Sequence, residues 1–297
     1  MAGFPPLAHP MQKYKKIVER DAYAVIFAEL MGKVKVCFEA ESDANMVVTG
    51  NPGTGKKEVK ELSSFDLVLN SEDTFYIYDA GSKAFMELNT EQVRALRQQH
   101  RVLRLIEGAS VQLTGWKGVS ILFASAGLEG MNNYAKVDSF TYILPVWTLE
   151  ELQDYNLLLD DGFKLADDVL ISRYDKFGGI PRFIFTATEL ENEDELERAI
   201  ATFSALDIIS YANSNHAVRD GTCSHVLKMV PSRVDFQADF HLDFLSTYVA
   251  EKIVAKVDKD SLQRVLKVAM AQINEGRSSV VRGKIYEMLC HSTNKNA

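Results

Sequence analysis

The segment GNPGTGKKEV at positions 50–59 limits the possible folds of this chain more than any other feature. It matches the phosphate-loop pattern G-x-x-x-x-G-K-[ST] at Gly50, Gly55 and Lys56, but Lys57 stands where the Mg²⁺-binding hydroxyl belongs. The apolar run NMVVTG leads directly into the loop, as the buried strand of a strand–loop–helix motif does. The sequence therefore predicts an α/β fold whose sheet carries a nucleotide site.

In such a site, backbone N–H groups and the start of the next helix hold the phosphates, and Lys56 reaches the β- and γ-phosphates. Lys57 would repel Mg²⁺ or partly replace its charge, so we expect hydrolysis to suffer more than binding. ATP is the expected cofactor, and the need for Mg²⁺ depends on Lys57. The alternative is a glycine-rich turn with a surface lysine. The expected nucleotide-binding residues of this segment are Gly50, Asn51, Pro52, Gly53, Thr54, Gly55, Lys56 and Lys57.

The connection that follows the loop is short. Only eight residues, 57–64, separate Lys56 from the next apolar run, whereas a parallel crossover generally needs about a dozen or more. Either part of the helix has been lost, or the next strand does not pair in the ordinary parallel way. Of these two explanations, we favour a lost segment.

Two polar residues follow later apolar runs and are candidate catalytic residues. Glu107 ends the run VLRLIEG, where an acidic side chain can hold Mg²⁺ through water, so we expect it to be the metal ligand. Ser125, with Asn132 or Asn133, is expected to sense the γ-phosphate. Arg104 interrupts the apolar run before Glu107, so Glu107 could instead be a surface glutamate at the end of a strand without a metal. Likewise, Ser125 could belong to a simple loop that senses no phosphate.

Composition narrows the class of protein further. The 297 residues are 46% hydrophobic and 25% charged, which suits one large globular domain or two smaller ones. A net charge of -8 argues against general nucleic-acid binding. The N-terminus lacks an export signal and no apolar stretch could cross a bilayer, so we expect a soluble protein of the cytoplasm or nucleus without a membrane partner. Three separated cysteines and scattered histidines predict neither disulfides nor a zinc site.

Hydrophobic patterns divide the chain into four expected segments. Residues 1–44 form a helical leader with Ala22 and Val25 on its apolar face, and residues 45–147 form a core of about five mostly parallel strands. Residues 148–222 form a helical lid subdomain, and residues 223–297 a hairpin followed by helices. The expected strands contain NMVVTG, FDLVLN, TFYIYDAG, VLRLIEG, VSILFASAG and FTYILPVW.

The C-terminal half has its own local signals. Thr148 and Glu151 have the spacing of a capping box, which predicts a helix start. The stretch SHVLKMVPSRVDFQADF predicts the hairpin, and helical patterns begin near Leu242, Lys259 and Val280.

Four motifs in this order, VVTGNPGTGK, FTYILPVWTLEEL, RYDKFGGIPRFIF and RGKIYEMLCH, resemble the P-loop NTPase module of Crinkler-type effectors and trypanosome retrotransposon hot spot proteins. The resemblance covers about residues 45–291, and PVWTLEEL followed by FGGIPR is its most specific part. It implies an AAA-like or STAND-like ATPase with Glu107 as the Walker B acid. Gly179 and Pro181 would form a G-x-P element of the lid near the nucleotide base, and Arg182 a phosphate or interface sensor.

The resemblance also implies a protein partner, and it is the only reason to consider nucleic acid, because these modules are often coupled to a nuclease-like domain. The resemblance is also compatible with a protein that is secreted and acts inside a host cell. The chain departs from the pattern in the missing hydroxyl, the short helix, the Glu at position 107 and the early end after RGKIYEMLCH. We therefore expect an ATP-binding scaffold or effector module with weak or absent hydrolysis. The alternative is a nucleotide-free interaction module with a vestigial loop.

Overall fold

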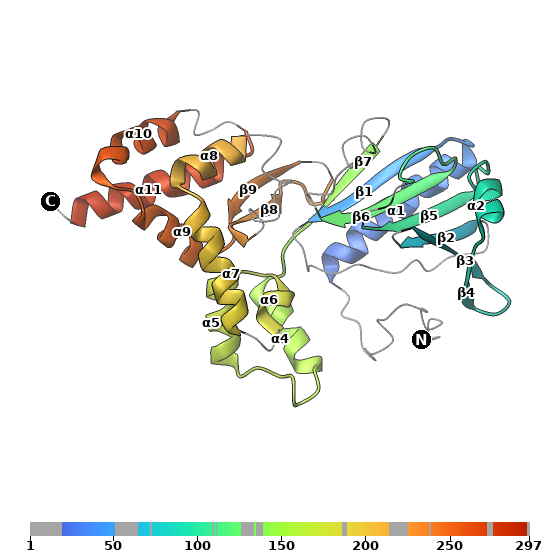
Figure 1. Ribbon diagram of the computed structural model, residues 1–297, viewed down its shortest axis with the longest axis horizontal. Coiled ribbons are helices and arrows are strands. Elements are labelled where there is room, and N and C mark those ends of the chain that lie inside the picture. The colour runs from blue at the N-terminus through green and yellow to red at the C-terminus, as the bar shows by residue number, and fades with distance from the viewer. Residues whose placement is uncertain are drawn as a thin grey trace. The chain divides into compact units, whose positions relative to one another are not determined.

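The computed structural model describes residues 20–50, 65–71, 73–108, 110, 112–125, 134, 139–185, 189–213, 225–237, 239–271 and 276–295. The chain divides into two compact units (Figure 1). The first comprises Met1–Thr49, Gly55–Leu144 and Asp235–Ala238, and the second comprises Gly50–Thr54, Pro145–Val234 and Asp239–Ala297. The four-part division expected from the sequence stays a prediction.

A sheet forms the centre of the first unit. Its strand order is β4-β3-β2-β5-β6-β1-β7, and β2, β5 and β6 are parallel neighbours. Strands β2, β3 and β4 form an antiparallel meander at one end of the sheet. The strands are β1 (Ala44–Gly50), β2 (Asp66–Ser71), β3 (Thr74–Asp79), β4 (Ala84–Glu87), β5 (Val102–Glu107), β6 (Val119–Ser125) and β7 (Ser139–Leu144).

The predicted α/β class with a mostly parallel sheet is confirmed, but the described residues contain seven strands in this sheet instead of about five. Every apolar run assigned to a strand contains one. The strand that the sequence analysis missed is β4, which lies at the sheet edge and exposes half of Met86, so it lacks the apolar pattern of a covered strand. Helix α2 (Thr90–Leu96) was also missed, although Asn89 and Gln92 form a capping box at its start.

Strand order bears on the short connection after the phosphate loop. Strand β2 does not pair with β1, because β6 and β5 lie between them. It pairs in parallel with β5 and antiparallel with β3. Since β2 is parallel to β5, the connection from β1 is still a parallel crossover, and it passes two intervening strands. The strand order therefore does not explain the short connection, and the lost segment stays a prediction.

Helix α1 (Asp21–Glu39) covers one face of the sheet (Figure 1). Its buried side chains recur at helical spacing and pack with apolar side chains of β1, β2, β5, β6 and β7. The helix confirms the pattern expected at Ala22, but Val25 was wrongly placed on the apolar face: it is exposed, while its neighbour Ile26 is buried. The buried residues of α1 are Ala22, Tyr23, Ile26, Leu30, Val34 and Phe38.

The second unit combines helices with a two-stranded hairpin. Thr148 and Glu151 form the predicted capping box at the start of the first helix. The predicted hairpin is confirmed as β8 and β9, but the helix expected from Leu242 begins only at Thr247, because Leu242 belongs to β9. The elements are α4 (Leu149–Leu158), α5 (Asp167–Phe177), α6 (Pro181–Phe185), α7 (Glu189–Thr202), α8 (Ala205–Asn213), β8 (Leu227–Pro231), β9 (Phe240–Phe244), α9 (Thr247–Ala255), α10 (Lys259–Met270) and α11 (Ser279–Lys295).

The loop between β8 and β9 returns to the first unit. Tyr142 of β7 forms an antiparallel bridge with Gln237, and the Ile143 amide donates to the Phe236 carbonyl at 2.8 Å. Strand β7 therefore gains a partner from a segment that is far away in the sequence.

Candidate functional site at the carboxyl ends of three strands

The three strands β1, β6 and β5 are consecutive neighbours, and each ends at a residue that the sequence analysis selected. Gly50 ends β1, Ser125 ends β6 and Glu107 ends β5. The amide of Ala44 donates to the carbonyl of Gly118 at 3.1 Å, which places the starts of β1 and β6 side by side. Because β6 is parallel to β5, the carboxyl ends of all three strands lie along one edge of the sheet.

This edge lies at a reversal of the strand order. The strand that follows β1 in the sequence is β2, which lies on the β6 side of β1 beyond β6 and β5. The strand that follows β6 is β7, which lies on the opposite side of β1. Connections that leave neighbouring strands in opposite directions open a crevice at the carboxyl ends, which is where ligands bind in open α/β sheets. The crevice expected from this rule lies at the end of β1.

Glu107 is half-buried and held in register from both sides. It is paired with Ser71 of β2 and Phe123 of β6, and the following residue, Gly108, donates its amide to the Phe123 carbonyl at 2.9 Å. Gly108 has a φ of +70°, so the chain turns sharply after Glu107. The carboxylate therefore stands at the rim of the sheet, where a ligand at the end of β1 could meet it.

The buried end of β1 carries one polar group directly before the predicted phosphate loop. Thr49 exposes 5% of its surface, and its Oγ1 has no hydrogen-bond partner within the described part of the chain. A buried hydroxyl without a partner is costly, so it is a group that a bound ligand or water can satisfy. The predicted phosphate-binding residues Asn51, Pro52, Gly53, Thr54, Gly55, Lys56 and Lys57 lie outside the described residues, as do Asn132, Asn133 and the side chain of Ser125.

The G-x-P element lies in the second unit, and its nearness to the phosphate loop stays a prediction. Its glycine has a clear packing role there. The Gly179 carbonyl accepts the Trp147 amide at 2.7 Å, and a Cβ on Gly179 would lie 1.8 Å from the Trp147 carbonyl oxygen. Pro181 starts α6, and Arg182 of the same helix is exposed.

Arg104, which interrupts the apolar run of β5 in the sequence, is a buried cation in the structure. Its side chain is fully buried in β5, donates to Asn70 Oδ1, and lies 4.6 Å from the ring centroid of Trp116. Burial lowers the pKa of Arg104 to about 10. A cation in the middle of an apolar strand was the available signal, but the sequence does not reveal that Asn70 and an aromatic ring surround it.

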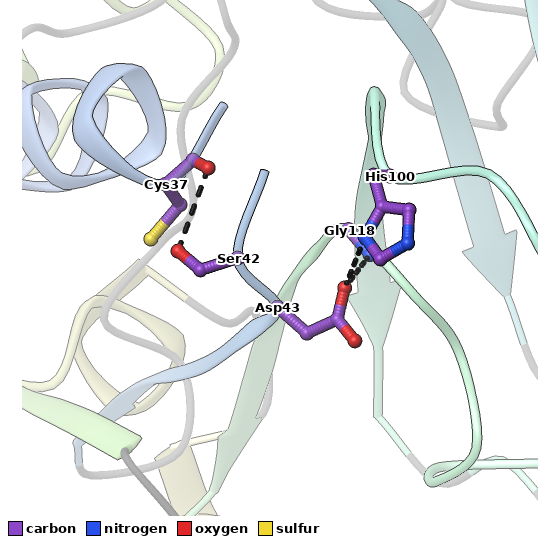
Figure 2. A network of polar contacts seen from close by, with 5 residues as sticks. All are labelled: Cys37, Ser42, Asp43, His100 and Gly118. Carbon is purple, nitrogen blue, oxygen red and sulfur yellow. Dashed lines mark hydrogen bonds and ion pairs between the residues drawn. The ribbon is translucent and has the colours of Figure 1, made fainter. Parts of the chain in front are cut away.

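A second polar cluster lies at the opposite edge, where the strands begin (Figure 2). Asp43, just before β1, accepts the Gly118 amide at 2.7 Å, and His100 Nδ1 lies 3.1 Å from the same carboxylate oxygen. These residues precede β1, β6 and β5, so the cluster ties together the amino ends of three strands. Its place away from the carboxyl ends favours a structural role.

The described residues contain no group of three or more His, Cys, Asp and Glu side chains that could hold a metal ion. In the same part of the chain, no helix is long and apolar enough to cross a membrane.

A scan against protein-family models gives no match for this chain, and the search of curated proteins finds no significant relative. The resemblance to Crinkler-type modules therefore stays a hypothesis that rests on the motifs themselves.

Proposed function

We propose that the chain is an ATP-binding P-loop protein of the Crinkler and retrotransposon hot spot class, with weak or absent hydrolysis. The observation that carries the proposal is the strand order β5-β6-β1, which brings Glu107, Ser125 and Gly50 to one edge at a reversal of the sheet. Residues that end neighbouring parallel strands lie at one edge of the sheet, which is where the proposed nucleotide site requires them.

The spacing of the strands suits the expected roles. Strands β1 and β5 are two positions apart, or about 10 Å, with β6 between them. A carboxylate at that distance reaches a metal beside the phosphates through water, as expected for Glu107, and does not contact the phosphates directly. Ser125 ends the intervening strand, which is the nearest position to the γ-phosphate of a nucleotide held at β1.

The remaining roles follow from side-chain chemistry. Lys56 would bind the β- and γ-phosphates, and the Lys57 ammonium would supply positive charge near the usual position of Mg²⁺. When bound, Mg²⁺ neutralises charge on the phosphates and positions them for transfer. In the proposed lid, Gly179 and Pro181 would face the base, and Arg182 would report the nucleotide state to a protein partner.

Lys57 also motivates a second candidate function, a nucleotide-free interaction module. An ammonium replaces the expected metal ligand, so the site has lost one element that hydrolysis normally requires. In that case the sheet would serve as a scaffold for binding a partner, and the loop would bind no phosphate.

Isothermal titration with ATP separates the two functions. We expect ATP to bind the purified chain with Mg²⁺ and also in the presence of a chelator, because Lys57 replaces part of the metal's charge. Lys56→Ala should weaken binding by at least about tenfold, since a charge-assisted hydrogen bond contributes roughly 1.5–3 kcal/mol. Lys60→Ala, which removes a lysine outside the motif, is the matched control.

Two results would contradict the proposal. Absence of ATP binding under both conditions would favour the interaction module. Binding that depends strictly on Mg²⁺ would show that Lys57 does not replace the metal.

A further inference from the structure

The last turn of α4 and the connection to α5 present apolar side chains to solvent. Leu157 is 73% exposed, Phe163 is 72% exposed and Leu158 is 42% exposed. Single exposed apolar residues are common on protein surfaces, but three of them within seven residues are unusual. Leu152 and Leu170, from the two flanking helices, are fully buried, so these helices already have a packed side.

This connection has a defined shape. Asn156 is buried, its Nδ2 donates to the Leu165 carbonyl at 2.8 Å, and its Oδ1 accepts the Leu165 amide at 2.9 Å. Within the loop, the Phe163 amide donates to the Asp160 carbonyl at 2.8 Å. Asn156 thus closes the end of α4 and the following turn, residues 157–164, into one segment, which we call the docking loop. A closed loop loses little conformational entropy when it binds.

The surroundings of the docking loop are acidic. Residues 148–177 contain eight acidic and three basic side chains. The basic ones have partners: Lys164 pairs with Asp161, Arg173 donates to the Ile184 carbonyl, and Lys176 pairs with Glu193. The exposed acidic side chains of this region include Glu150, Asp154, Asp160, Asp167 and Asp168.

We propose that Leu157, Leu158 and Phe163 bind an amphipathic helix of a partner protein, whose apolar stripe is flanked by Lys or Arg side chains. The apolar groups supply contact area and the surrounding carboxylates select the charge of the partner. The same carboxylates would repel anionic lipid and nucleic acid. A symmetric contact between two copies would bring the two acidic regions together, which disfavours self-association through this surface. The inference does not depend on nucleotide binding.

A synthetic Leu/Lys helical peptide of roughly 18 residues is a suitable probe. Fluorescence anisotropy with the full chain and no nucleotide should show saturable binding of the labelled peptide. Leu157→Ser combined with Phe163→Ser should weaken this binding by about tenfold or more, because it removes two central apolar anchors. The same peptide with Glu in place of Lys should bind at least about tenfold more weakly than the Lys peptide.

Leu190→Ser is the matched control, since Leu190 is 71% exposed but belongs to α7. It should bind the Lys peptide like the unmodified chain, and all variants should retain the same melting temperature within a few degrees. The proposal is overturned if the Lys peptide does not bind, if the double variant binds it equally well, or if the Glu peptide binds as tightly. Sedimentation that shows a dimer lost in the double variant would identify a second copy as the occupant and would also overturn it.

Discussion

The buried side chain of Arg104 contributes to the stability of β5, the strand that ends at Glu107. Arg104 is fully buried, and Asn70 Oδ1 accepts its hydrogen bond. Removing one member of such a pair leaves the other without its buried partner, whereas replacing both with apolar side chains of similar volume is often neutral. The energetic value of Arg104 therefore depends on Asn70.

We predict that Asn70→Leu will be clearly destabilising, by about 3 kcal/mol, because it leaves the guanidinium with fewer hydrogen bonds in a buried site. Arg104→Met combined with Asn70→Leu should be more stable than Asn70→Leu alone. Urea unfolding of both single variants and the double variant measures the coupling, which should reach about 1.5 kcal/mol. Additive effects would show that the two side chains are energetically independent.

Among the elements, the two glycines before α6 pack closely against the segments that lead into α9 and α4. Gly178 has a φ of +64° and approaches the Leu245 carbonyl, while Gly179 packs on the backbone of Trp147. A Cβ at either position would overlap backbone atoms that cannot move independently. The motif FGGIPR is thus explained in part by packing before any role in nucleotide recognition is considered.

Gly179→Ala should destabilise the protein by about 2 kcal/mol or more, because the added Cβ would overlap the Trp147 backbone and force the two segments apart. Gly283→Ala is the control: Gly283 lies in α11, its Cβ would meet no atom within 4 Å, and alanine favours a helix by about 0.5–1 kcal/mol. Thermal unfolding should show opposite shifts for the two variants. Equal melting temperatures would mean that the second unit adjusts to the added methyl group.

The elements also show what the sequence could and could not predict. Strands such as β5 and β6 were recognisable because covered strands need continuous apolar runs. Strand β4 gave no such signal, since its edge position leaves most of its side chains exposed. The neighbours of β1 could not be read locally, because strand order depends on pairing between distant segments. The link between Gly50 and Glu107 therefore became visible only in the sheet.

For the molecule as a whole, the proposed function depends on several parts at once. The predicted phosphate loop follows β1, its proposed acid Glu107 ends β5, and the proposed lid belongs to the second unit. Restoring one ligand cannot restore hydrolysis if the others are misplaced by even a small distance.

We predict that Lys57→Ser will not produce vigorous ATP hydrolysis, although it restores the phosphate-loop pattern. The hydroxyl supplies one Mg²⁺ ligand, but transfer also requires a held metal, an oriented water and usually an arginine. Steady-state turnover of the purified variant should remain below about 1 per second, with Lys56→Ala combined with Lys57→Ser as the background control. A kcat at or above that value would identify Lys57 as the sole defect.

The bridge between Tyr142 and Gln237 has a consequence for how the protein is made. Gln237 follows Tyr142 by 95 residues, so the outer edge of β7 has no partner from this segment while the ribosome synthesises the intervening helices. At roughly 5–20 residues per second, that interval lasts on the order of 5–20 s. An unpaired strand edge is prone to pair with another chain, so the nascent chain is exposed to aggregation during this interval and a chaperone would protect it.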